Sequence, residues 1–328
     1  MAVKEHALGH VIRSIHIAEL GPLRDLQIAL PALPMQHLLL TGSNGCGKSA
    51  LLLALRQRLT AITDGQWHKL KLFERKKAPG AAQQSLFEKY SGGVRLELDG
   101  GSTVDTDFAQ GEFITAYFGA ERQALFEPVH AVEEVTLPVS CGFDAKPASL
   151  LLKYMVHLKT QQAYARQEGN EMLSGLIDAW FEQWQTLLCE LFNDWDLALE
   201  YDFRRYRFLI RLSNREPFGF DALSGGYAAV MAIIADLIMR MEPNWLSEGM
   251  LPLYDCDGVV LIDEPEAHLH EDLKIRLLPI LTQFFPNLQF IVATHEPRLL
   301  ASKVEDEVLI YDLDRRSVSS VDPLPIGG

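Results

Sequence analysis

The sequence predicts an α/β fold with a mixed sheet and an inserted helical lobe, and two observations carry this prediction. The C-terminal third alternates short apolar runs with a segment of helical spacing: GVVLIDE (258–264), EDLKIRLLPILTQFF (271–285, with Pro279 inside it) and LQFIVATH (288–295). Such alternation is typical of a parallel sheet with helices on its faces. From Ser149 to Asp194 the pattern is helical throughout, which predicts the lobe.

The N-terminal part predicts further strands and one helix. VIRSIHIAEL (11–20) and RDLQIAL (24–30) flank a Gly21-Pro22 turn signal and are expected to pair. HLLLTG (37–42) is a short apolar run, typical of a buried strand, and it leads into SNGCGKSALLLALRQRL (43–59), whose leucines have helical spacing. Two more segments are strand candidates: VRLEL (94–98) and EFITAYF (112–118).

The helical segment carries a broad apolar stripe, followed by a hairpin pattern. A core face explains the stripe better than an aromatic cofactor site, because helices usually bury themselves through such stripes. LALEYDF (197–203) and YRFLIRL (206–212) predict the hairpin. We expect one composite domain, with a first part at 1–148, the lobe and hairpin at 149–222, and the rest of the core at 223–328. The stripe contains Leu173, Leu176, Ile177, Trp180, Phe181, Trp184, Leu187, Leu188 and Leu191.

Composition places the chain among globular proteins of a reducing compartment. It has 328 residues, of which 48% are hydrophobic and 23% charged, and a formal net charge of −14. The N-terminus lacks the apolar core of a signal peptide, and no segment reaches the length of a membrane span. The four cysteines (Cys46, Cys141, Cys189 and Cys256) have neither CxxC nor zinc spacing. These features predict a cytoplasmic protein with free thiols.

GSNGCGKS, residues 42–49, matches the phosphate-loop pattern G-x-x-x-x-G-K-[ST] in full, between a predicted strand and a predicted helix. Glycines let the backbone wrap phosphate groups with N–H groups pointing inward. Lys48 is expected to reach the β- and γ-phosphates, and Ser49 to hold Mg²⁺ through its hydroxyl. The phosphate cradle comprises Asn44, Gly45, Cys46, Gly47, Lys48, Ser49 and Ala50.

Three polar residues end two of the predicted strands. Asp263 and Glu264 follow VVLI, and His295 follows the strand that begins at Leu288. Ligand sites gather where parallel strands end. With a phosphate loop present, we expect Asp263 to support Mg²⁺ and Glu264 to activate the attacking water as general base.

A Ser-Gly-Gly-Tyr sequence, Ser224 to Tyr227, precedes an apolar run of helical spacing. Serine and glycine favour helix starts, and the free N–H groups of a helix start attract anions. The chain therefore contains two predicted anion cradles.

These four motifs, in this order, resemble the ABC-type ATPase heads of the SMC, RecF and OLD-like (AAA_21-type) group. The resemblance covers roughly residues 10–60 and 220–312 and implies ATP and Mg²⁺ as ligands. It also implies two heads that pair and sandwich two ATP molecules, so that Ser224, Gly225 and Gly226 cap the γ-phosphate bound by the partner. Lys48, Glu264 and His295 would then be the catalytic residues, with His295 as switch histidine.

The sequence also departs from this group. LSGGY has Tyr227 where transporter heads usually have glutamine, and Gln123 in GAERQ is only a weak candidate for the glutamine loop. EPEAHLH resembles the group's segment near the dimer seam, which suggests His268 and His270 as interface residues. The segment between phosphate loop and signature is too short for the long coiled coil of SMC proteins.

The resemblance implies a slow ATPase of anti-phage defence that pairs head to head and controls a separate effector, a nuclease or toxin. The tail after the switch strand is too short for the fused nuclease of OLD-like proteins, so we expect the effector on another polypeptide. A RecF-like repair ATPase that binds DNA directly is the alternative, although the net charge of −14 disfavours it. A transporter subunit is less favoured.

Two basic segments could bind nucleic acid, which is therefore a further candidate partner. WHKLKLFERKK carries Lys69, Lys71, Arg75, Lys76 and Lys77 in a loop-like context. FRRYRFLIR (203–211) is predicted to place three arginines on one strand face. Two interpretations are equally favoured for both segments. Either the segment binds nucleic acid or an acidic partner, or its charges are solvated or paired within the protein surface. The three arginines are Arg205, Arg207 and Arg211.

Overall fold

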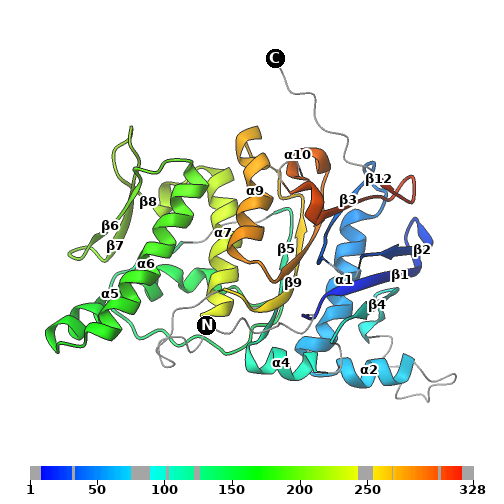
Figure 1. The fold of residues 1–328 in the computed structure, drawn as a ribbon, viewed down its shortest axis with the longest axis horizontal. Helices are drawn as coiled ribbons and strands as arrows, with labels where there is room; N and C mark the ends of the chain where they lie inside the picture. The colour runs from blue at the N-terminus through cyan, green and yellow to red at the C-terminus, as the bar shows by residue number, and fades with distance from the viewer. Residues whose placement is uncertain are drawn as a thin grey trace.

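The computed structural model describes residues 9–31, 34–74, 89–100, 103–121, 126–242, 254–267, 269–301 and 304–319. Within them a six-stranded sheet of order β12-β11-β3-β10-β9-β5 forms the centre of the molecule (Figure 1). Neighbouring strands from β11 to β5 run parallel, and β12 is antiparallel to β11. The strands are β3 (His37–Thr41), β5 (Phe113–Phe118), β9 (Asp257–Asp263), β10 (Leu288–Ala293), β11 (Val308–Asp312) and β12 (Ser317–Ser319).

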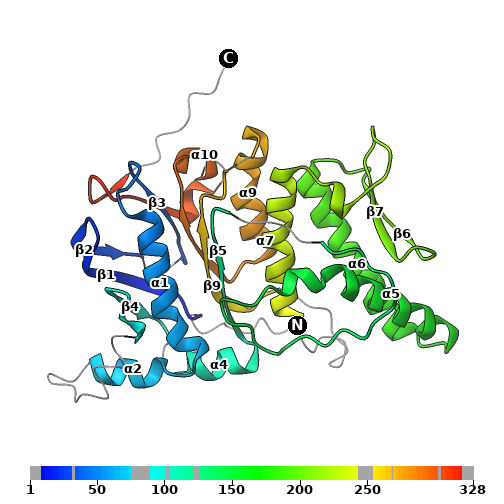
Figure 2. The same cartoon turned by 180° about the vertical axis from the view of Figure 1, so that it is seen from behind.

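Helices cover both faces of this sheet. Helix α1 (Lys48–Thr63) lies on one side, and α7 (Gly225–Met241) and α9 (Glu271–Phe284) lie on the other (Figures 1 and 2). The alternation of strand side chains produces this arrangement. In β9, Val259 and Leu261 belong to the core that contains α1, whereas Val260 and Ile262 belong to the core that contains α7 and α9.

A smaller antiparallel sheet of order β2-β1-β4 packs on α1 from the side away from the central sheet. Its strands are β1 (Ile12–Leu20), β2 (Leu23–Ala29) and β4 (Val94–Leu98), and the predicted Gly21-Pro22 turn joins the first two. The short helices α2 (Trp67–Glu74) and α4 (Val104–Gln110) lie next to α1.

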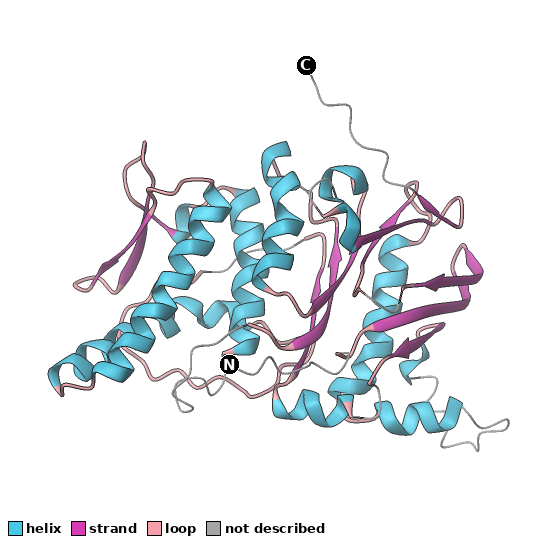
Figure 3. Ribbon diagram, viewed as in Figure 1, coloured by secondary structure: helices cyan, strands magenta, loops and turns pink. Residues whose placement is uncertain are grey.

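The helical lobe forms the opposite end of the molecule (Figure 3). It contains α5 (Leu151–Gln167) and α6 (Glu171–Phe192), and Asn170 caps α6 by accepting the Leu173 N–H at 3.1 Å. A small sheet follows, with β6 (Ala198–Asp202), β7 (Arg207–Arg211) and β8 (Phe218–Gly219). The described residues also contain α10 (Pro297–Ala301) and three 3₁₀ turns, Pro147–Leu150, Phe220–Ala222 and Glu305–Glu307.

The structure confirms the predicted α/β fold with a mixed sheet and a helical lobe. The apolar stripe of α6 is a core face, as expected, and its two tryptophans, Trp180 and Trp184, are almost fully buried. Helix α9 continues through Pro279. All four cysteines lie in the described part of the chain and are free thiols. Among the described helices, none is long and apolar enough to cross a membrane.

The loop expected at WHKLKLFERKK (67–77) is wrong for its first 8 residues, because residues 67–74 form helix α2. The helix start is capped from a distant element: the Asp105 carboxylate accepts the N–H groups of Trp67 and His68 at 3.2 and 3.0 Å. Such a cap leaves no trace in the local sequence. Lys69 and Lys71 lie on this helix, whereas Arg75, Lys76 and Lys77 fall outside the described residues.

The predicted arginine face of the hairpin is correct for only two of its three residues. Arg205 lies in the turn between β6 and β7, with its N–H bonded to the Asp202 carbonyl, and not on a strand. Arg207 and Arg211 do share one face of β7. Each forms an ion pair within the lobe, with Asp221 and Glu200 respectively, which agrees with the ion-paired alternative.

Stability is expected to fall below pH 6.5 because of His37 at the start of β3. Burial lowers the pKa of His37 from 6.5 to about 4, and its Nδ1 accepts the Phe290 N–H at 3.2 Å. The folded state therefore favours the neutral ring. The stabilisation is complete above pH 6.5 and is lost as the pH falls toward 4, by up to about 3 kcal/mol. Urea unfolding of wild type and His37→Gln, which keeps an acceptor, tests this. A stability difference between the two that does not change from pH 7 to pH 4 would contradict it.

Candidate functional site

The carboxyl ends of three parallel strands bring the predicted site residues to one edge of the central sheet. Ala293, the last residue of β10, is in register with Leu40 of β3 on one side and Asp263 of β9 on the other. Backbone hydrogen bonds continue past the strand ends. The Thr294 N–H donates to the Leu40 carbonyl at 3.0 Å, and the Glu264 N–H donates to the Ala293 carbonyl at 2.9 Å.

The glycine-rich loop leaves β3 at Thr41 and enters α1 at Lys48. Gly42, Gly45 and Gly47 have φ values of 143°, 81° and 106°, a region that other residues rarely adopt. A Cβ on Gly42 would lie 2.7 Å from the Cys46 Sγ, so this position also lacks space for a side chain. The exposed residues of the loop and first helical turn are Ser43, Asn44, Gly45, Ser49 and Ala50.

The Lys48 side chain folds back over its own loop. It is only 6% exposed, and its Nζ donates to the carbonyl oxygens of Gly42 and Ser43 at 2.9 and 3.1 Å. The Asp314 carboxylate, from the turn after β11, accepts the Ser43 N–H at 2.5 Å and the Ser43 hydroxyl at 3.1 Å. Sequence reasoning missed Asp314. It lies beside the loop because β11 is parallel to β3.

Asp263, Glu264 and His295 meet at the same edge. The Asp263 side chain is buried, whereas the Glu264 and His295 side chains are each 39% exposed. The His295 Nε2 lies 3.3 Å from the Glu264 Oε1. Glu264 has a φ of 45°, an uncommon conformation for any residue except glycine and one that is often found at functional sites.

Glu266 is a buried carboxylate at this edge that sequence reasoning also missed. Its Oε1 accepts the Thr294 hydroxyl at 2.7 Å and the His295 N–H at 2.6 Å. The second glutamate of DEPE was the available sequence signal, but its partners come from a strand end that follows 28 residues later.

The Ser-Gly-Gly segment lies apart from this edge. Ser224 is the N-cap of α7 and is exposed, as is Gly225, while Gly226 is partly buried. Since α7 and α1 cover opposite faces of the sheet, this helix start and the glycine-rich loop lie on different sides (Figures 1 and 2). Tyr227 stacks on Phe192 at the end of α6, with ring centroids 4.5 Å apart. This stack ties the helix start to the helical lobe.

Two weaker predictions fall outside the described residues. Gln123 and His268 belong to the segments that the structure does not describe. His270 is described: it is exposed and is the N-cap residue of α9, where its carbonyl accepts the N–H groups of Leu273 and Lys274.

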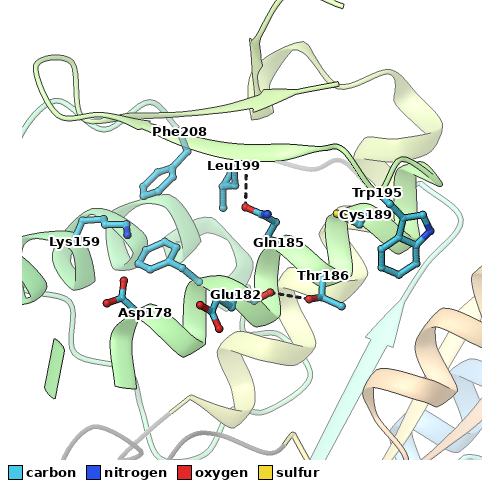
Figure 4. Close-up of a pocket in the computed structure, with 10 residues that line it drawn as sticks. Lys159, Asp178, Glu182, Gln185, Thr186, Cys189, Trp195, Leu199 and Phe208 are labelled. Carbon is cyan, nitrogen blue, oxygen red and sulfur yellow. Dashed lines mark hydrogen bonds between the residues drawn. The ribbon is translucent and has the colours of Figure 1, made fainter. Parts of the chain in front are cut away.

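A cavity of about 440 Å³ lies between α6 and the β6–β7 hairpin (Figure 4). The residues that line it belong to the helical lobe and hairpin and not to the strands that end at the candidate site. The Gln185 Oε1 accepts the Leu199 N–H across it at 3.5 Å. The Lys159 Nζ lies 3.8 Å from the Phe181 ring centroid. None of the predicted site residues that the structure describes lines this cavity, and the strand-end acids and glycine-rich loop remain the candidate site.

The chain matches one protein family over more than half of its length. Residues 96–301 match the AAA_21 family, described as an AAA domain, putative AbiEii toxin, Type IV TA system. The match includes the Ser-Gly-Gly segment, the strand-end acids and His295, and it begins after the glycine-rich loop.

The proteins that the chain is similar to include two curated relatives and one solved structure. The Septu protein PtuA of Bacillus mycoides (strain KBAB4) is 26% identical over 320 residues, 91% of this chain and 40% of that protein. The Retron Ec83 probable ATPase of Escherichia coli is 39% identical over 91 residues, 28% of this chain and 16% of that protein. The chain thus spans well under half the length of these relatives. The structure of an SMC head bound to the C-winged helix domain of ScpA aligns over 92% of this chain and 93% of that one, with 14% identity and a TM-score of 0.43.

Proposed function

The chain belongs to the AAA_21 family, and from this premise we propose that it is an Mg²⁺-dependent ATPase that works as a molecular switch. The observation that carries the proposal is the convergence at one sheet edge of a glycine-rich loop, a buried aspartate and a Glu264–His295 pair. A phosphate cradle beside acids and a histidine is suited to phosphoryl transfer to water.

The residues of the loop fit a nucleoside triphosphate. The positive φ values of Gly42, Gly45 and Gly47 let the backbone curve around phosphate oxygens, at the N-terminus of α1. Lys48 is held by two neutral carbonyls of its own loop. A phosphate oxygen is a stronger acceptor for the ammonium group than a carbonyl, so we expect Lys48 to exchange these bonds for phosphate contacts.

Each of the remaining site residues has a proposed role. The Ser49 hydroxyl and the Asp263 carboxylate would hold Mg²⁺, and the bound metal and triphosphate would supply an activated γ-phosphoryl group. Glu264 orients the attacking water and accepts its proton, and His295, 3.3 Å from Glu264, orients that carboxylate and contacts the γ-phosphoryl end.

We assign Ser224, Gly225 and Gly226 to the nucleotide of a second copy of the chain. The exposure of Ser224 and Gly225 and their position across the sheet from the glycine-rich loop support this assignment. The expected assembly is a homodimer that closes when ATP is bound. We expect slow ATP turnover, at the low end of the usual range of about 1–10³ s⁻¹, because a switch must persist in its ATP state.

The proposed output is control of a separate effector protein, a nuclease or toxin, in anti-phage defence in the cytoplasm. The family description, which names a putative toxin and a toxin–antitoxin system, and the similarity to a retron ATPase support it. The free cysteines agree with a reducing compartment. Nucleic acid remains a lower-ranked partner, because the described arginines of the hairpin face are ion-paired.

Two variants test the ATPase and the shared site together. Lys48→Ala is expected to weaken ATP binding about 10- to 100-fold, the loss of one charged hydrogen-bonding group. Ser224→Arg is expected to block the second cradle without weakening ATP binding. Each variant alone should lose ATP hydrolysis, measured as phosphate release, whereas Lys153→Ala, a lysine paired with Glu133 on the lobe, should retain it.

Mixing the two inactive variants distinguishes a shared site from a site within one chain. A mixed dimer contains one composite site with an intact Lys48 and an intact Ser224, so turnover should return. If the mixture stays inactive while each variant is folded, the cradle does not act on a partner. If wild type releases no phosphate from ATP in the presence of Mg²⁺, the ATPase itself is wrong.

A further inference from the structure

The carboxylate of Glu266 links the end of β9 to the end of β10. It is 7% exposed, and its Oε1 accepts two hydrogen bonds from consecutive residues after β10, the Thr294 hydroxyl and the His295 N–H. Bonds of this kind to an ionised acceptor are about twice as strong as neutral ones.

The direction of the Thr294 bond follows from its neighbours. The Thr294 Oγ1 accepts the Glu296 N–H at 2.9 Å. A hydroxyl has one proton, and this arrangement leaves that proton for Glu266. Thr294 is fully buried, so its rotamer is fixed by packing as well as by these two bonds.

Glu264 and Glu266 hold His295 at two different points. Glu264 faces the imidazole Nε2 at 3.3 Å, and Glu266 binds the backbone N–H at 2.6 Å. The turn that carries both acids is itself closed, because the Ala267 N–H donates to the Glu264 carbonyl at 3.2 Å. Glu266 therefore contributes to the position of the ring relative to the Glu264 carboxylate, together with the backbone bond from the Glu264 N–H to the Ala293 carbonyl.

We infer that Glu266 is a positioning residue that fixes the distance between the proposed base Glu264 and the proposed switch histidine His295. This inference rests on the ATPase proposed above. Without the Glu266 carboxylate, the Thr294 hydroxyl and the His295 N–H lose their shared acceptor, and the Glu264–His295 distance is expected to widen. Misplacement of catalytic groups by about 1 Å costs up to about 10²-fold in rate.

The test compares Glu266→Ala with Glu266→Gln. The glutamine oxygen accepts both hydrogen bonds, so Glu266→Gln is expected to keep most of the activity. Glu266→Ala is expected to lower kcat for ATP hydrolysis about 10- to 100-fold, while KM and the affinity for ATP stay within about two-fold of wild type. A purely structural role would instead lower the melting temperature and ATP affinity together and would leave kcat of the folded fraction unchanged.

Thr294→Val provides a second variant that preserves side-chain volume and removes only the hydroxyl. It is expected to lower kcat less than Glu266→Ala, because Glu266 still accepts the His295 N–H. In the double variant the effects of the two changes should combine to less than their sum, because both break the Thr294–Glu266 bond, although Thr294→Val also removes the acceptor of the Glu296 N–H. If Glu266→Ala does not fold, a Thr294→Val variant with wild-type kcat overturns the inference. If the wild type hydrolyses ATP and Glu266→Ala has the same kcat, this inference alone is overturned. If the wild type itself does not hydrolyse ATP, the proposed function is overturned.

Discussion

Glu264→Gln is expected to lower ATP turnover by about 10²- to 10⁴-fold, the usual contribution of a general base, while ATP binding is retained. The substitution keeps the size of the side chain and the backbone conformation at φ 45°. It removes the negative charge that orients and deprotonates water and that faces His295 at 3.3 Å. The loss should therefore appear in kcat and not in the affinity for ATP.

The same variant should accumulate the paired form. If ATP holds two chains together and hydrolysis releases them, blocking hydrolysis traps the dimer. Mass measurements with and without ATP should show a dimer for Glu264→Gln and a monomer for Lys48→Ala. Glu271→Gln, an exposed acid in the first turn of α9, serves as a control with unchanged turnover. Equal masses with and without ATP in both site variants would contradict ATP-driven pairing.

The local pattern of the sequence is sufficient for most of the fold. Apolar alternation and leucine spacing depend on residues close in sequence, so the strands around the glycine-rich loop and helices α1, α6 and α9 are found where predicted. Helix α2 was missed because its start is capped by Asp105, which is 38 residues from Trp67 in the sequence.

In the candidate site, too, some residues could be predicted from the local sequence and others depend on distant parts of the chain. The strand-end residues Asp263, Glu264 and His295 were predicted because parallel strands end at a common edge. Glu266 and Asp314 were not, because their partners are fixed by strand register, which no local pattern reveals. Tyr227 illustrates a third case. It was noted as a departure from the transporter signature, but its packing partner Phe192 is known only from the structure.

Helix α7 contains a buried ion pair, and removing one of its partners is expected to lower the stability of the fold strongly. Asp236 interrupts an otherwise apolar run, and Arg240, one turn later, pairs with it at 2.6 Å. Burial raises the pKa of the Asp236 carboxyl, and the Arg240 charge opposes that shift. The Arg240 guanidinium also donates to four backbone carbonyls, those of Thr115, Cys141, Gly142 and Ala145. One side chain therefore connects helix α7, β5 and the loop at 141–145.

Arg240→Met is expected to lower the free energy of unfolding by about 3–5 kcal/mol, the usual cost of removing one partner of a buried ion pair. The variant leaves the Asp236 carboxylate without its cation and the four carbonyls without this donor. Urea unfolding measures the loss. Arg166→Met, which breaks the exposed pair with Asp178, should cost only about 0–1 kcal/mol.

A double variant separates the charge from the carbonyl contacts. Asp236→Asn with Arg240→Met removes the uncompensated charge, so we expect it to be less destabilised than the sum of the two single variants. Any stability that the double variant still lacks, relative to wild type, then includes the cost of the lost carbonyl contacts. A loss below about 1 kcal/mol for Arg240→Met would place this pair with exposed ion pairs and contradict its role in holding helix α7 against β5.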